Sequence, residues 1–249
     1  MSFRYLREID IDANIVGYNV GFGQDFRWQA YHIARYFEKL VYRKIKNEFT
    51  KFCFSFHPKP PENGRFEERA SSGEIIYRDK YVPYVDALRV NAYFDFDQYA
   101  RFENDIDKNK MITDVFEREL IDALVHCGVG AEGKTAAINA FNEIRRNDYV
   151  YRGTYKKPLA SPNKKYKVWF DYACRIDVID VYARVRKPRA KHDLHACHFA
   201  TIPANWDAPD GYIESIVWLS EDEFVAKRGD VTWRQRRFNI AECKVDYYN

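Results

Sequence analysis

Three histidines within seven residues form the densest group of side chains that could do chemistry in this chain. In KHDLHACHF they are His192, His195 and His198, and Cys197 stands between the last two. Imidazole and thiolate groups are good zinc ligands, although this segment alone does not gather four of them. A pair of these histidines is also suited to acid–base work on RNA. The sequence therefore leaves three interpretations open: a zinc site, a histidine-dependent catalytic site, and ordinary histidines at a strand edge.

The histidines follow a strongly basic segment. Residues 145–191 carry 14 Lys and Arg against 4 Asp and Glu, whereas the whole chain has a net charge of only +3. Such a segment favours a surface for phosphate groups or for an acidic protein, and solvated strand faces are the alternative. Aromatic neighbours such as Tyr166 and Trp169 offer stacking surfaces. The candidate binding residues are Arg152, Lys156, Lys157, Lys164, Lys165, Arg184, Arg186, Lys187, Arg189 and Lys191.

The stretch GVGAEGKT, residues 128–135, matches the pattern of a phosphate-binding loop. In such a loop Lys134 would reach the terminal phosphates and Thr135 would bind magnesium. That loop must follow a buried parallel strand, but the preceding ERELIDALVHC has helical spacing. We therefore expect a link between two helices, which Gly128 begins by ending the first helix.

Asp95 and Asp97 in YFDFD share a strand face and are suited to binding a divalent ion, with Asp177 or Asp180 as a third carboxylate. An acidic patch that contacts a protein is an equally good interpretation. G-x-S-x-G, H-E-x-x-H and C-x-x-C are all missing from the sequence. The sequence thus indicates no common enzyme class.

Hydrophobic periodicity shows which elements must position these residues. Apolar residues recur at helical spacing over 24–49, 112–127 and about 134–146, which predicts three helices. Strict alternation over 51–57 and 88–96 predicts two strands, each with one solvated face.

The remaining segments read as loop and sheet. Pro and Gly content predicts a loop over 57–73. From Tyr149 onward aromatic and β-branched residues alternate between turn signals, which is typical of an antiparallel meander. The apolar positions change from even to odd numbers near Asp177–Asp180, so we expect a bulge or tight bend there.

Length and composition indicate the fold class and the domain organisation. With 249 residues, 46% hydrophobic and 17% aromatic, the chain can bury a proper core. We predict an α+β fold with about three helices in the first 146 residues, packed on a mostly antiparallel, aromatic-rich β-meander. The chain would form a single domain, 1–249, with a possible subdivision near 147–150 into a helix-containing part (1–147) and a β-rich part (148–249).

Cysteine usage and hydropathy bear on the compartment. The five cysteines are odd in number and widely spaced, so we expect free thiols and no disulfide framework. Apolar runs are far shorter than a membrane helix requires, and the N-terminus lacks the apolar stretch of a secretory signal. A soluble, cytoplasmic protein without membrane contact is the expectation.

One segment carries a resemblance. Residues 110–185, with ELIDALVHCGVGAEGKTAAINAFNEIRRNDYVYRGTYKK and then KYKVWFDY, resemble in style bacterial immunity and other small toxin-neutralising proteins. The resemblance implies a non-enzymatic, cytosolic protein that binds a protein partner, occluding its active site by shape and charge. It implies no functional residue and no cofactor. The alternative function is a nucleic-acid or nucleotide-phosphate binder that uses residues 145–191, with a metal- or His-dependent phosphodiesterase or nuclease as a variant.

Overall fold

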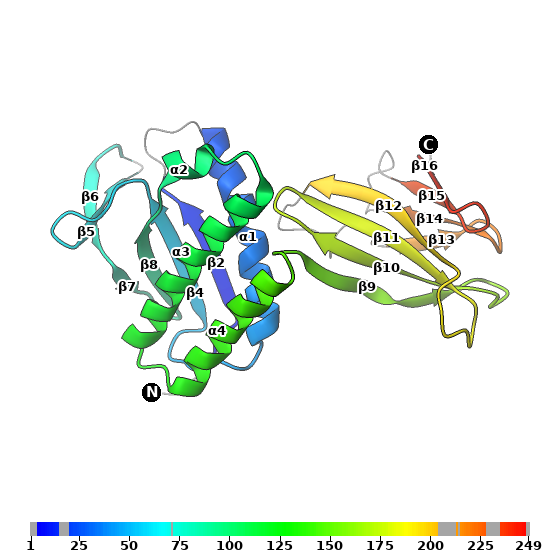
Figure 1. Cartoon of the computed structure of the whole chain (residues 1–249), viewed down its shortest axis with the longest axis horizontal. Coiled ribbons are helices and arrows are strands. Elements are labelled where there is room, and N and C mark those ends of the chain that lie inside the picture. Colours follow the sequence, from blue (N-terminus) through cyan, green and yellow to red (C-terminus); the bar gives the residue numbers. More distant parts are fainter. Residues whose placement is uncertain are drawn as a thin grey trace. The chain divides into compact units, whose positions relative to one another are not determined.

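The computed structural model describes residues 4–14, 20–70, 72–203, 213, 215–227 and 235–247. These residues form an α+β fold, as predicted, and they contain four helices. The chain divides into two compact units, Met1–Tyr151 (unit 1) and Arg152–Asn249 (unit 2) (Figure 1). The boundary lies within a few residues of the subdivision considered near 147–150.

Unit 1 is built on a four-stranded sheet in the order β2-β4-β8-β7. The two inner pairings, β2 with β4 and β4 with β8, are parallel, and β7 runs antiparallel to β8. Local sequence patterns do not predict this parallel pairing. The strand bounds are β1 Arg4–Tyr5, β2 Glu8–Ala13, β3 Lys46–Asn47, β4 Lys51–His57, β5 Arg65–Arg69, β6 Ile75–Asp79, β7 Tyr81–Pro83 and β8 Ala87–Tyr93.

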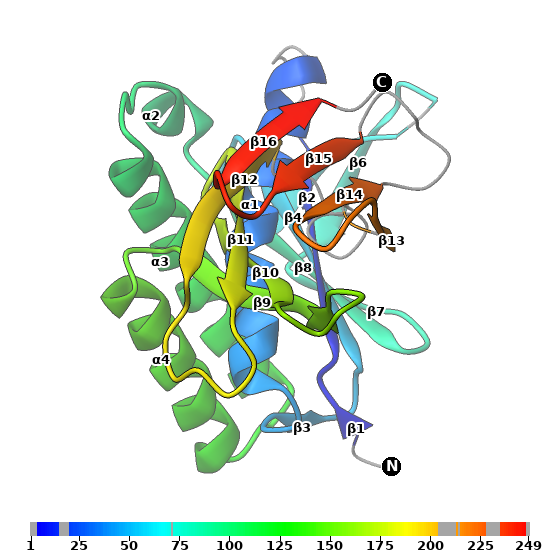
Figure 2. The ribbon, with the colours of Figure 1, turned by 90° about the vertical axis from the view of Figure 1, so that its right-hand side faces the viewer.

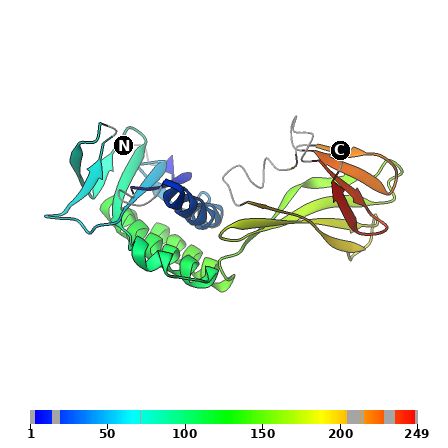
Figure 3. The same ribbon diagram turned by 90° about the horizontal axis from the view of Figure 1, so that it is seen from above.

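The described residues of this unit form three long helices and one short helix. Figure 3 shows α3 and α4 together on one side of the unit 1 sheet. The alternating residues of β4 and β8 bury their apolar side chains, and Phe37, Phe54, Phe116 and Phe141 pack ring against ring in this core. The helices are α1 Val20–Val41, α2 Phe96–Ala100, α3 Asp105–His126 and α4 Ala131–Arg146.

The predicted helix over 24–49 needs correction at both ends. It begins at Val20, so Asp25 lies inside the helix and is not its N-cap. It ends at Val41, and Arg43 has a φ of +57°, which a continuing right-handed helix does not allow. Ile45 keeps the apolar period because it is buried after the turn, which explains the overlong prediction.

Two further boundaries differ from expectation. The predicted loop over 57–73 contains β5, which pairs antiparallel with β6. The strand predicted over 88–96 ends at Tyr93, because the Asp95 side chain accepts a hydrogen bond from the Gln98 amide and caps α2. Phe94 and Phe96 are both buried, so the alternation continues past the end of the strand.

Unit 2 contains two four-stranded antiparallel sheets, in the orders β12-β11-β10-β9 and β13-β14-β15-β16. Phe170 of the first sheet lies 6.0 Å from Phe224 of the second, and Phe199 lies 6.3 Å from Phe238, so the two sheets pack face to face. The predicted antiparallel meander is confirmed. The strands are β9 Tyr151–Ala160, β10 Lys167–Cys174, β11 Val178–Arg186, β12 His195–Pro203, β13 Ser215–Trp218, β14 Glu223–Lys227, β15 Arg236–Asn239 and β16 Lys244–Tyr247.

The change of phase near residues 177–180 has a simple cause. β10 ends at Cys174 and β11 begins at Val178, with Cys174 opposite Ile179. The tight bend is therefore the hairpin turn at 175–177, just before the expected position.

The expectation of five free thiols is wrong for one pair. Cys197 and Cys243 form a disulfide, whereas Cys53, Cys127 and Cys174 are not disulfide-bonded. Cys197 lies on β12 and Cys243 precedes β16, so the bond joins the two sheets of unit 2. Spacing along the chain did not reveal this pair because its members are 46 residues apart.

Candidate functional site

The meander of unit 2 brings much of the basic segment to one end of a sheet. The links β9–β10 (161–166) and β11–β12 (187–194) emerge at the same end, because Lys167 at the start of β10 is paired with Arg186 at the end of β11 (Figures 1 and 2). We call this group of cations the basic end. It consists of Lys164, Lys165, Lys167, Arg184, Arg186, Lys187, Arg189 and Lys191.

Hydrogen bonds hold the first link in a defined turn. The Ser161 hydroxyl accepts a hydrogen bond from the Tyr166 amide at 3.0 Å and donates one to Asn163 Oδ1 at 2.9 Å. Asn163 Oδ1 also accepts from the Lys165 amide at 2.9 Å. The tip of this turn is Lys164, with a φ of +59°.

The second link has the same feature. Arg189 has a φ of +67° and is the third residue of the turn 187–190, which the Ala190 backbone N–H closes by donating to the Lys187 carbonyl at 3.1 Å. Both links thus place a cation in the left-handed region, where glycine or asparagine is usual.

Two arginines of the basic end are already held by carboxylates. Arg184 donates from Nε to Asp193 at 2.6 Å and from Nη1 to Asp171 at 2.7 Å. Arg186 donates from Nε to the other Asp193 oxygen at 2.9 Å. Burial acts to raise the pKa of Asp193, but the hydrogen bonds from the two arginines outweigh it and hold this pKa below its usual value.

An aromatic ring completes this cluster. The guanidinium carbons of Arg184 and Arg186 lie 5.6 and 4.9 Å from the centroid of the Trp169 ring, within cation–π range. Thr154 donates to Asp171 at 2.8 Å and so links β9 to the same network. Trp169, Arg184, Arg186 and their carboxylates therefore form a rigid group on the outer face of the sheet, which we call the Trp169 cluster.

The other cations of the basic end differ in their partners. Lys165 pairs with Asp222 at 3.1 Å. Among the described residues, the remaining five form no ion pair, and all five are exposed. These five free cations are Lys164, Lys167, Lys187, Arg189 and Lys191.

Three of the predicted binding residues do not join this group. Arg152 is exposed at the start of β9, at the opposite end of the sheet. Lys156 and Lys157 lie in β9, but their side chains are outside the described residues. Lys167 and Asp193 are not among the binding residues predicted from the sequence. Lys167 continues the run of Lys164 and Lys165, whereas the role of Asp193 depends on the folded hairpin.

The histidines and the cysteine of the segment 192–198 do not form a common site in the structure. Cys197 is buried and bonded to Cys243, so its sulfur is not a free thiolate, and its assignment as a metal ligand is wrong. His198 is exposed, and its Nε2 lies 2.9 Å from the Thr201 hydroxyl. His192 is exposed in the β11–β12 link, and His195 begins β12. The described residues contain no group of three or more His, Cys, Asp or Glu side chains placed to hold a metal ion.

The other motifs have structural roles. GVGAEGKT connects α3 to α4 as predicted: Gly128 follows the end of α3 with a φ of +67°, and Lys134 and Thr135 lie in α4. Asp95 caps α2 and Asp97 lies in its first turn, so the two do not share a strand face as expected.

Comparisons with protein-family models, with curated proteins and with solved structures found no match to this chain. None of the described helices is both long enough and apolar enough to cross a membrane. The site must therefore be interpreted from its own geometry.

Proposed function

We propose that this protein is a binding module whose unit 2 holds an acidic surface of a partner protein against the basic end. The observation that carries the proposal is the arrangement of five free cations around the Trp169 cluster. Trp and Arg are the residues that most often dominate the energy of a protein interface, especially where they are rigid. The surrounding positive charges favour a partner surface of negative charge and speed its association.

Two features favour a protein over a nucleic acid. Asp171 and Asp193 stand among the cations, so the surface has mixed sign, which suits protein contact better than a run of phosphates. Tyr166 is buried and the Trp169 ring already carries two guanidinium groups. Neither ring is then an open platform of the kind that single-stranded nucleic acids use for base stacking.

The toxin-neutralising role implied by the sequence resemblance belongs to this proposal. A neutraliser that acts by occlusion needs a rigid surface of definite charge, and a basic end would face an acidic region beside the toxin's active site. Zinc binding or acid–base chemistry at His192, His195 and His198 remains a separate prediction. The proposal does not depend on it.

The test is capture of partners from the native host with two charge-matched variants. The first changes the five free cations to Gln; the control changes five exposed cations of unit 1 that form no ion pair among the described residues. The control residues are Arg7, Lys39, Lys44, Arg69 and Arg101. Both variants lose the same charge, so a general effect of net charge acts on them equally.

We expect a protein partner that survives nuclease treatment and is kept by the control variant. The basic-end variant should bind it at least tenfold more weakly. Hydrogen exchange should show protection of residues 161–167 and 187–194 in the complex. Capture that disappears with nuclease would replace the proposal by the nucleic-acid alternative, and equal binding by both variants would refute it.

A further inference from the structure

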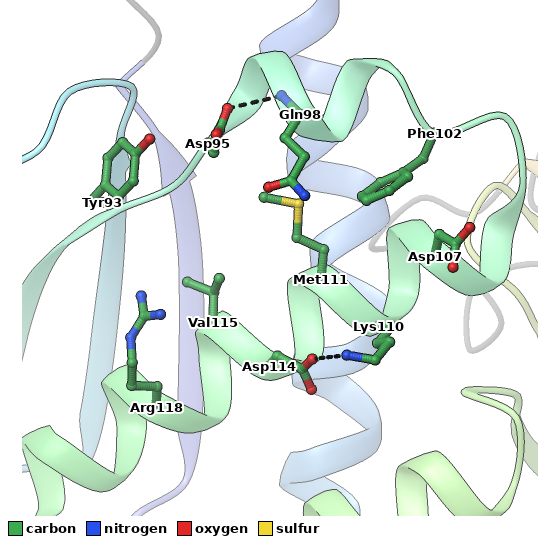
Figure 4. A pocket seen from close by; sticks show the side chains of 10 residues that line it. All are labelled: Tyr93, Asp95, Gln98, Phe102, Asp107, Lys110, Met111, Asp114, Val115 and Arg118. Carbon is green, nitrogen blue, oxygen red and sulfur yellow. Dashed lines mark hydrogen bonds and ion pairs between the residues drawn. The ribbon is translucent and has the colours of Figure 1, made fainter.

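A cleft of about 380 Å³ lies in unit 1 beyond the carboxyl end of β8, between α2 and α3 (Figure 4). Ligands of open sheets with parallel strands commonly bind beyond the carboxyl ends of those strands, and the volume suits a small molecule. The cleft is independent of the basic end. The lining residues on which the argument rests are Tyr93, Asp95, Phe102, Met111, Val115 and Arg118.

One carboxylate in the cleft is held in place with part of its capacity unused. Asp95 Oδ1 accepts a hydrogen bond from the backbone N–H of Gln98 at 2.9 Å, which fixes the Asp95 side chain as the N-cap of α2. This contact uses one oxygen, and Asp95 forms no ion pair among the described residues. The second oxygen remains to accept a hydrogen bond from a cationic group.

One guanidinium is held in a similar way. Arg118 donates from Nε to Glu119 at 2.8 Å, and Glu119 is a buried carboxylate that also pairs with Lys80 at 3.1 Å. The contact at Nε leaves the two terminal nitrogens of Arg118 for a carboxylate, which a guanidinium binds with paired hydrogen bonds.

The space between these charges is apolar. Figure 4 shows Asp95 and Arg118 on different sides of the cleft, with Val115 between them and Met111 and Phe102 further along. The other charged pair in the lining, Lys110 with Asp114, satisfies itself, and Arg145 binds the second Asp114 oxygen at 2.8 Å. Asp107, which Figure 4 shows beyond Phe102, accepts a hydrogen bond from Asn104 Nδ2 at 2.7 Å at the start of α3. The charges on either side of the apolar surface are therefore Asp95 and Arg118.

We propose that this cleft binds a small zwitterion with an apolar body, of the short-peptide class. Asp95 holds the ammonium group, Arg118 holds the carboxylate, and Met111 and Val115 contact the apolar side chains. The Tyr93 hydroxyl lies beside Asp95 and supplies a further donor or acceptor at that end.

The test is isothermal titration of the full chain with Leu-Leu and its two blocked forms. N-acetyl-Leu-Leu lacks the ammonium group, and Leu-Leu amide lacks the carboxylate. We expect Leu-Leu to bind and each blocked peptide to bind about tenfold more weakly, because each loses one charged contact. The proposal would be overturned if either blocked peptide bound as tightly as Leu-Leu, or if Leu-Leu did not bind.

Two variants assign the contacts to residues. Asp95→Asn removes the charge but retains an N-cap that serves as well as Asp, so α2 is preserved. It should weaken the binding of Leu-Leu about tenfold and leave the binding of N-acetyl-Leu-Leu unchanged. Arg118→Gln should also weaken the binding of Leu-Leu about tenfold, but it should leave the binding of Leu-Leu amide unchanged. Glu103→Gln and Arg101→Gln change exposed charges outside the cleft and should not alter binding. A loss of the same size in these controls would contradict the assignment.

Discussion

At the scale of single residues, His57 shows how burial and hydrogen bonding oppose each other. Its ring nitrogens lie 3.0 Å from the Glu67 carbonyl oxygen and 3.0 Å from Asn91 Oδ1. Asn91 Nδ2 donates to the Asp79 carbonyl, which orients Oδ1 toward the ring. A neutral imidazole donates to only one of two acceptors, whereas the protonated ring donates to both. Burial is nevertheless the larger effect and lowers the pKa of His57.

This pKa shift predicts a loss of stability in acid. The unfolded chain binds a proton near the ordinary value of about 6.5, and the folded chain binds it at a lower pH. The free energy of unfolding should therefore fall as pH decreases from 7.5 to 5.5, by at most about 1.4 kcal/mol per pH unit for one proton. Urea unfolding of the parent chain and of His57→Gln at both pH values measures the difference.

The His57→Gln variant should lose that part of the pH dependence, even if it is less stable overall. His192→Gln serves as the control because His192 is exposed, and it should behave as the parent does. An unchanged pH profile in His57→Gln would show that protonation of this ring does not affect folding. Arg89 and Glu68 are the charged groups near the ring, and Arg89 lowers while Glu68 raises its pKa.

At the scale of elements, the two hairpin tips of unit 2 separate backbone strain from charge. A lysine or arginine in the left-handed region costs roughly 1 kcal/mol relative to glycine. Lys164→Gly and Arg189→Gly should each leave the chain as stable or up to about 1 kcal/mol more stable, and each should weaken partner binding. Chemical denaturation and binding to the captured partner are the two measurements.

Alanine variants at the same positions complete this experiment. Lys164→Ala and Arg189→Ala remove the charge but keep a side chain in the strained conformation, so they should weaken binding without added stability. If the glycine variants bind as well as the parent, the two cations do not belong to the interface.

Other elements show where local patterns sufficed. The link between α3 and α4 was predicted from ERELIDALVHC and Gly128, because helical spacing and a left-handed glycine are local properties. The end of β8 was misplaced, because Phe94 and Phe96 remain buried beyond it. Alternation reports burial, and it does not report which residues pair in a sheet.

At the scale of the whole molecule, the disulfide between Cys197 and Cys243 should stabilise unit 2 in particular. It closes a loop of 46 residues and joins two packed sheets, which stabilises a fold by roughly 2–4 kcal/mol. Reduction should therefore accelerate hydrogen exchange in β10 and β14, whereas exchange in β4 and β8 of unit 1 should not change. Mass spectrometry of peptides from the intact chain measures both sets of strands.

Cys243→Ser should reproduce the effect of reduction, and adding reductant to this variant should change nothing further. Equal exchange in the oxidised and reduced chains would show that the packing between Phe170 and Phe224, and between Phe199 and Phe238, holds the sheets together without the bond.

The sequence by itself determined the α+β class, the approximate helices and central strands, the antiparallel meander and the helix link at Gly128. Periodicity and turn residues act over a few neighbours, so one sequence is sufficient to read them. Only the tertiary structure decided the parallel pairing of β2, β4 and β8, the Cys197–Cys243 bond and the gathering of Lys164, Lys167 and Arg189 at one end. These features depend on strand register and on contacts between distant segments, which the local pattern does not encode.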